Sequence, residues 1–138
     1  IRGEFTMNRW DKTTDIIVLN HVLEHIPDPT KMIKDTFAVL KPGGILIIGV
    51  PNFGSYLARA KKSRWQSLIP NQHRWHFSRQ TLDRLVIPLG FSRVGITSSN
   101  HDRSIHPTWK RPFYVILDTI SQMFMNGEAI IVAYQKKS

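Results

Sequence analysis

The sequence predicts a three-layer α/β domain, because short apolar segments alternate along it with segments in which apolar residues recur at helical spacing. The clearest strand is DIIVL at 15–19, a continuous run typical of a strand covered on both faces, as in a parallel sheet. A second run, ILIIGV at 45–50, has the same character. Ligands of such sheets bind beyond the carboxyl ends of the strands, so the residues that follow these two runs are the first candidates for function.

The segment between these two strands predicts one helix. Asp28 followed by Pro29 predicts its start, since a capping carboxylate and a proline at the first helical position both favour a helix N-terminus. Lys41 suits the negative end of the helix dipole, and the KPGG turn ends the helix. The apolar residues at helical spacing are Met32, Ile33, Phe37 and Leu40. Strand, helix and strand form a βαβ unit, for which a right-handed crossover is expected.

The rest of the chain continues the alternation. Ser78 predicts the N-cap of a second clear helix, which Pro88 and Gly90 close. The strand after it alternates polar and apolar residues, which favours a position nearer the edge of the sheet. In chain order, the remaining predicted elements are a short basic helix at 55–65, this strand at 91–97, a polar loop at 98–112, a helix at 112–125 and a strand at 128–134.

Composition bounds the class of protein. A chain of 138 residues suits one domain, and the absence of cysteine excludes disulfides and thiolate metal sites within it. No apolar run approaches the roughly 20 residues that a membrane-spanning helix needs. The net charge of +9 suits either a basic soluble surface or an anionic partner. We expect a cytoplasmic protein in which residues 1–6 (IRGEFT) come from an expression vector and 7–138 are the domain itself.

One motif is the H-x-x-E-H pattern of some zinc peptidases, formed by His21, Glu24 and His25. That chemistry needs both histidines on one face of a sustained helix and a third protein ligand downstream. Here a strand ends just before the motif and Pro27 follows it, so at most a turn or two of helix fits. The only later glutamate is Glu128, in a predicted strand. We therefore predict no zinc-peptidase site and assign no metal.

Two longer segments carry a family resemblance. The first, at 15–52, is DIIVLNHVLEHIPDPTKMIKDTFAVLKPGGILIIGVPN, and the second, at 73–91, is HRWHFSRQTLDRLVIPLGF. The first resembles the fourth strand, following helix and fifth strand of class I S-adenosylmethionine-dependent methyltransferases. The second is similar to the subgroup that includes ubiquinone-biosynthesis methyltransferases. The resemblance covers roughly residues 14–98 and implies a Rossmann-like fold holding the family's strands 4-5-7-6, with the last strand antiparallel.

The resemblance also implies a function and a missing part. The family's first half supplies a Gly-rich loop and an acidic residue that hold S-adenosylmethionine, and nothing before Asp15 matches them. We therefore expect the C-terminal half of a methyltransferase, inactive alone, whose complete form methylates a small-molecule acceptor at oxygen, nitrogen or carbon. Two alternatives stay open, a non-catalytic α/β interaction module and a basic nucleic-acid-binding module. Charge alone supports the second, so we expect no nucleic-acid partner.

Cofactor and acceptor residues follow from the two strand ends. The resemblance implies that Leu19, Asn20 and His21, which end the first strand, contact S-adenosylmethionine, although a polar strand terminus is the plainer interpretation. Asn52 and Tyr56 follow the second strand and are predicted to line the acceptor site.

Three further histidines complete the predicted site. His25 lies near the expected acceptor pocket, although it could equally stabilise the turn. His73 and His76 flank Trp75 just before a helix. Because a histidine titrates near neutral pH, either could act as general base for a hydroxyl acceptor; loop packing is the competing interpretation.

Two surfaces are predicted to meet partners. The family neighbour of strand Asp15–Leu19 is missing, so its free edge predicts a homodimer, burial by residues 5–14, or aggregation. The basic segment Arg59–Arg64, with Tyr56 and Trp65 beside it, could sit on an anionic lipid surface or form an ordinary solvated helix face.

Overall fold

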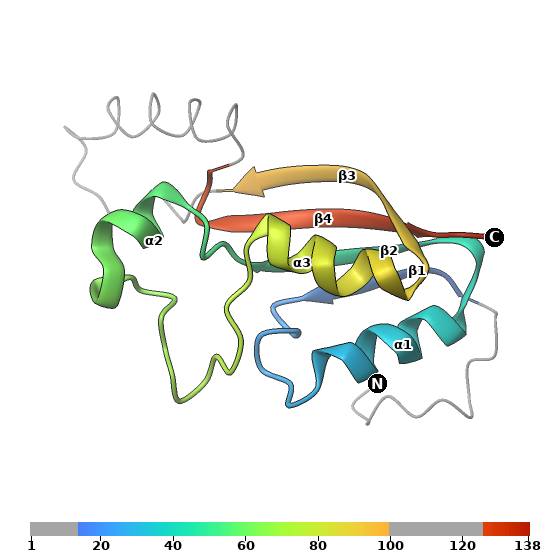
Figure 1. Ribbon diagram of the computed structural model, residues 1–138, viewed down its shortest axis with the longest axis horizontal. Coiled ribbons are helices and arrows are strands. Elements are labelled where there is room, and N and C mark those ends of the chain that lie inside the picture. The colour runs from blue at the N-terminus through green and yellow to red at the C-terminus, as the bar shows by residue number, and fades with distance from the viewer. Residues whose placement is uncertain (1–13, 100–125) are drawn as a thin grey trace.

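The computed structural model describes residues 14–99 and 126–138, which form a four-stranded sheet with helices packed on it (Figure 1). The strands are β1 (Thr14–Asn20), β2 (Leu40–Pro51), β3 (Phe91–Ser99) and β4 (Ala129–Lys136). The helices are α1 (Pro29–Val39), α2 (Tyr56–Lys61) and α3 (Arg79–Val86), with 3₁₀ turns at Lys62–Arg64 and Ile87–Leu89. The predicted helix at 112–125, the loop before it from residue 100 on and residues 1–6 lie outside the described residues, whereas the first two residues of that predicted loop belong to β3.

The order of strands in the sheet is β1-β2-β4-β3. β1 and β2 are parallel, as the βαβ unit requires, and β4 runs antiparallel to both of its neighbours. This is the predicted 4-5-7-6 arrangement with its last strand antiparallel, so the predicted fold class is confirmed. The parallel pair brings the carboxyl ends of β1 and β2 to the same edge of the sheet.

Both predicted helix starts are confirmed by their caps. The Asp28 side chain accepts a hydrogen bond from the Lys31 amide at 2.9 Å. Ser78 and Thr81 form a reciprocal capping box at the start of α3, in which each side chain accepts from the other residue's backbone amide. These bonds satisfy donors that the first helical turn would otherwise leave free.

The C-terminal end of α1 differs from the prediction. Lys41 does not hold it, because its Nζ bonds both Asp15 carboxylate oxygens at 2.8 and 3.0 Å. Lys136, far along the chain on β4, donates instead to the carbonyls of Phe37 at 2.6 Å and Leu40 at 2.7 Å. A cation from another strand thus occupies the negative end of the helix dipole.

The start of β2 also differs from the prediction. Leu40 already pairs with Thr14, five residues before the predicted start at 45, and the register then shifts before Ile16 pairs with Ile45. The KPGG residues form this irregular stretch, in which Gly43 adopts a positive φ of 76°. The glycine accommodates a backbone conformation that other residues rarely adopt.

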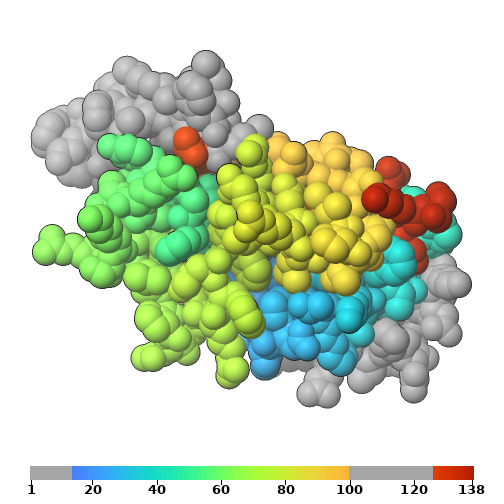
Figure 2. All heavy atoms as spheres, viewed as in Figure 1, coloured from blue at the N-terminus to red at the C-terminus, as the bar shows by residue number. Residues whose placement is uncertain are grey.

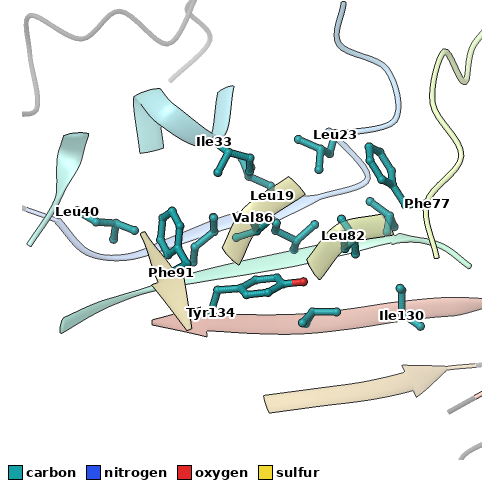
Figure 3. Close-up of a cluster of buried hydrophobic side chains, with 14 residues drawn as sticks. Leu19, Leu23, Ile33, Leu40, Phe77, Leu82, Val86, Phe91, Ile130 and Tyr134 are labelled. Atoms are coloured by element: carbon teal, nitrogen blue, oxygen red, sulfur yellow. The ribbon is translucent and has the colours of Figure 1, made fainter. Parts of the chain in front are cut away.

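The hydrophobic core lies between the sheet and the two helices α1 and α3, which pack on the same face (Figures 1 and 3). Ile33 of α1 and Leu82 and Val86 of α3 are fully buried. Alternate residues of the central strands meet them, and the strand residues of this cluster include Leu46, Ile48, Val50, Ile130, Val132 and Tyr134. Alternation of this kind places every second side chain of a strand on one face.

The opposite face of β1 is open. Ile16 and Val18, which pair with Ile45 and Ile47 of β2, are each 57% exposed. The expectation that β1 is covered on both faces is therefore wrong for this structure, in which β1 forms one edge of the sheet. None of the helices in residues 14–99 and 126–138 has the length and apolar character of a membrane span.

Candidate functional site

The candidate site lies beyond the ends of β1 and β2, where the chain leaves both strands on the same edge (Figure 1). Asn20 pairs with Gly49, and the His21 amide donates to the Gly49 carbonyl at 2.9 Å. Leu19 contributes its side chain to the core, so it can face a ligand only through its backbone. Of the three predicted cofactor residues, Asn20 and His21 have exposed polar side chains at this edge.

Gly49 sets the place of the Asn20 side chain. A Cβ built on Gly49 would overlap Asn20 Oδ1, so the amide lies in space that only a glycine leaves open. Sequence reasoning missed this residue, although a glycine inside an apolar strand is itself a sign of a close approach.

The H-x-x-E-H motif is not helical. His21 has a positive φ of 52°, and the chain turns rather than forming a helix between this residue and α1. Its Nδ1 lies 3.1 Å from Glu24 Oε1 and donates to it. Glu24 is 1% exposed, and its second oxygen, Oε2, has no hydrogen-bond partner within the described residues. Residues 21–28 thus lack the sustained helix on which a zinc-peptidase motif places both histidines on one face.

The turn that carries this motif is tied to the loop before α3. The amides of Arg74 and Trp75 both donate to the Glu24 carbonyl, at 2.8 and 3.2 Å. The Trp75 indole donates to the Ile26 carbonyl at 3.0 Å. Figure 2 shows the light-green loop lying against the blue segment that leads into α1. These bonds bring His73 and His76 to the side of the site that holds His25.

Three predicted histidines therefore gather in one cluster. The rings of His25 and His73 lie 4.8 Å apart, edge to face, and those of His73 and His76 lie 6.3 Å apart. His25 Nδ1 bonds the Gln72 carbonyl at 2.9 Å, and His73 Nδ1 bonds the Ser67 carbonyl at 2.7 Å. A carbonyl only accepts, so Nδ1 carries the proton in both rings and Nε2 keeps a free lone pair when the ring is neutral.

His76 has an apolar setting. Its ring stacks on Phe53 at 5.5 Å and lies 6.5 Å from the ring of buried Trp65. Partial burial, and then the neighbouring His73, lower the pKa of His76 below its ordinary value. Both causes favour the neutral ring, which is the form that accepts a proton.

The two other predicted acceptor residues differ from each other. Asn52 is buried, donates from Nδ2 to the Gly127 carbonyl at 2.9 Å and accepts from the Gly54 amide at 3.0 Å. Its amide thus joins the end of β2 to the segment before β4. Tyr56 is 67% exposed at the start of α2.

The basic segment beside Tyr56 is exposed at every one of its residues. Trp65, expected beside it on the surface, is instead 2% exposed and packs against Phe53. The segment therefore presents charge without the tryptophan that would enter a lipid interface, which favours the solvated-surface interpretation.

The chain resembles known protein families and curated proteins in sequence. A family model described as a methyltransferase domain matches residues 5–94. Among curated proteins, the chain is 49% identical over 45 residues to a ubiquinone biosynthesis O-methyltransferase of Coxiella burnetii, covering 31% of this chain and 19% of that protein. It is 29% identical over 89 residues to an uncharacterised protein of Methanocaldococcus jannaschii, covering 64% of this chain and 43% of that protein.

Solved structures share the fold. A possible histamine N-methyltransferase from Thermotoga maritima superposes with a TM-score of 0.69 at 19% identity, over 96% of this chain and 61% of that one. An S-adenosylmethionine-dependent methyltransferase from Methanosarcina mazei gives a TM-score of 0.62 at 17% identity, over 99% of this chain and 65% of that one. The chain spans less than half the length of the curated relatives above and under two thirds of these structures.

Proposed function

Because this chain belongs to the S-adenosylmethionine-dependent methyltransferase family, we propose that the complete protein transfers a methyl group from that donor to a hydroxyl oxygen of a small-molecule acceptor. The observation that carries the proposal is the gathering of Asn20, His21 and three histidines beyond the parallel ends of β1 and β2. The named O-methyltransferase relative supports oxygen as the acceptor atom.

In this proposal, residues at the ends of β1 and β2 bind the methyl donor. S-adenosylmethionine, when bound, supplies an electrophilic methyl group. Asn20 and His21 fit one side of such a ligand, because Gly49 holds open the space in which the Asn20 amide lies. Nothing in residues 14–99 and 126–138 supplies a Gly-rich loop, so we propose that this segment alone binds the donor weakly and is inactive.

Residues of the loop before α3 bind the acceptor and remove its proton in this proposal. The neutral ring of His76 accepts the proton of the acceptor hydroxyl, and Phe53 and Trp65 exclude water from one side of it. His73 lies next to this ring, and His25 lies against His73. Together with Tyr56, these two histidines orient the acceptor. The buried amide of Asn52 holds the end of β2 in place for these contacts.

The test is kinetic and uses the complete protein. His76→Ala should lower kcat by about 100- to 10,000-fold, the range that a general base contributes, while donor affinity stays unchanged. Asn20→Ala should instead weaken donor binding, measured by calorimetry. Lys34→Ala, an exposed change on α1, is the control for both. Unchanged turnover in His76→Ala, or an equal loss of donor binding and turnover, would refute the assignment of the base.

A further inference from the structure

We propose that Glu24, His25 and His73 form a binding site for a divalent first-row transition metal such as Zn²⁺. One ligand atom from each of the three residues lies within 4.8 Å of the other two. The H-x-x-E-H motif alone did not predict this group, because the third member comes from the loop before α3 and the glutamate serves as ligand rather than base.

The surroundings of the Glu24 carboxylate favour binding of a cation. Glu24 is 1% exposed, and its Oε1 accepts a hydrogen bond from His21 Nδ1 at 3.1 Å. Its Oε2 is buried and has no partner within the described residues. A buried carboxylate oxygen without a partner is costly, and a cation held by this carboxylate would offset that cost. His21 would then be an outer-sphere hydrogen-bond partner, of the kind that commonly orients a ligating carboxylate.

Both imidazoles are oriented in the way that metal-binding histidines usually are. Each ring donates its Nδ1 proton to a backbone carbonyl, of Gln72 for His25 and of Ser67 for His73. This contact fixes the tautomer and leaves Nε2 as the ligand atom. His25 Nε2 already lies 4.0 Å from Glu24 Oε1, which is too long for a hydrogen bond. Both atoms are acceptors when the ring is neutral, and a cation bound between them would stabilise their approach.

The backbone brings these ligands together before any ion binds. The Glu24 carbonyl accepts from the amides of Arg74 and Trp75, so the loop that carries His73 is anchored next to the turn that carries the other two ligands. Ligands of one tetrahedral zinc ion lie about 2.0–2.2 Å from it and therefore roughly 3.4 Å from one another. The widest separation in the group, up to 4.8 Å, must then shorten on binding. The side chain of His25 is 42% exposed and has the freedom to make that adjustment.

The ligand set selects the class of ion. Two imidazoles and one carboxylate suit Zn²⁺ and its first-row neighbours, whereas Mg²⁺ and Ca²⁺ prefer oxygen ligands alone. Three protein ligands leave a coordination position open. An acceptor hydroxyl bound there would lose its proton more easily; this role rests on the proposed methyl transfer, while the binding itself does not.

The test measures metal binding by the purified chain after treatment with a chelator. We expect one Co²⁺ per chain, seen by its visible absorption and displaced by Zn²⁺. Glu24→Gln, His25→Ala and His73→Ala should each weaken binding at least about tenfold, the lower end of what loss of even an outer-sphere partner costs. His76→Ala is the matched control, because that ring lies in the same loop but outside the group. An equal loss in the control, or no saturable binding to the unaltered chain, would overturn the proposal.

A second measurement avoids the risk that a variant fails to fold. Nitrogen NMR of the unaltered chain should show Zn²⁺ shifting Nε2 of His25 and His73 while the His76 nitrogens keep their positions. Shifts confined to other histidines would overturn the assignment. Because neither readout depends on turnover, failure of the metal site and failure of the proposed methyl transfer are distinguishable.

Discussion

The side chain of Asn20 depends on the residue opposite it, and this dependence can be tested. In Gly49→Ala the new Cβ would overlap Asn20 Oδ1 and push the amide from its place. In the complete protein we expect weaker donor binding, by up to about tenfold if one hydrogen bond worth about 0.5–1.5 kcal/mol is lost. Calorimetry with S-adenosylmethionine measures it. Gly95→Ala is the control, since its Cβ would meet only Ala133 at an ordinary 3.7 Å; equal affinity in both variants would contradict the role of Gly49.

Tyr134 links stability to alkaline pH. Its hydroxyl donates to Asp83 at 3.0 Å, and burial, then the charge of Asp83 and this bond, raise the pKa of Tyr134 well above its ordinary value, against a smaller opposing effect of Arg93. Above pH about 10 the unfolded tyrosine loses its proton while the folded one keeps it, so stability should fall by about 1.4 kcal/mol per pH unit. Tyr134→Phe should flatten this slope in urea unfolding between pH 9 and 11. Exposed Tyr56→Phe should leave it unchanged, and the same slope in all three proteins would count against the linkage.

Residues whose role is local could be predicted from the sequence, and residues whose partners are distant could not. Asp28 and Ser78 cap helices that begin one residue later, so their chemistry is visible in the sequence. The contact of His25 with His73 depends on a loop folding back across 48 positions, and no spacing rule contains that distance. The buried state of Asn52 likewise depends on Gly127. The site was therefore predicted as a group of candidates, and the structure shows which of them touch.

At the scale of elements, α1 is capped at its C-terminal end by a residue of β4. Lys136 Nζ bonds two carbonyls there and lies 4.3 Å from the centre of the Phe37 ring. Lys136→Met keeps most of the apolar stem but leaves the carbonyls without this donor. We expect a loss of about 1.5–3 kcal/mol, typical of a hydrogen bond to a charged group.

Urea unfolding at neutral pH measures the loss. The neighbouring Lys137→Met is the matched control, because Lys137 is exposed and should cost little. If the two variants unfold at the same urea concentration, Lys136 does not hold the end of α1.

The types and order of the described elements were predictable because apolar periodicity and caps are local signals. The start of β2 was not, since Leu40 joins the sheet through a register shift that glycine permits and no period reveals. Lys41 was assigned to the helix dipole on proximity alone, and Asp15 competes for it successfully from the neighbouring strand. Closeness in the chain therefore does not decide whether Lys41 pairs with the end of α1 or with the Asp15 carboxylate.

For the whole molecule, the open edge of β1 still predicts self-association. Ile16 and Val18 are exposed on a strand that has one neighbour, β2, among the strands of residues 14–99 and 126–138. Val18→Lys places a charge on that edge, a change that opposes strand pairing. Sedimentation velocity should show a dimer or larger species for the unaltered chain and a monomer for the variant.

The control for self-association is Val94→Lys, which changes a similarly exposed valine on β3 at the other edge of the sheet. It should associate as the unaltered chain does. A monomeric unaltered chain, or dissociation in both variants, would remove the assignment to β1.

The central place of β4 has a consequence for how the protein is made. β4 joins β2 to β3, yet it lies after both in the chain, so translation produces the β1–β2 pair and the unpaired strand β3 before the strand that unites them. At about 5–20 residues per second the nascent chain spends seconds in this divided state. During that interval the edges of β2 and β3 have no partner from β4. Chaperone demand during synthesis should therefore peak just before Ala129 leaves the ribosome.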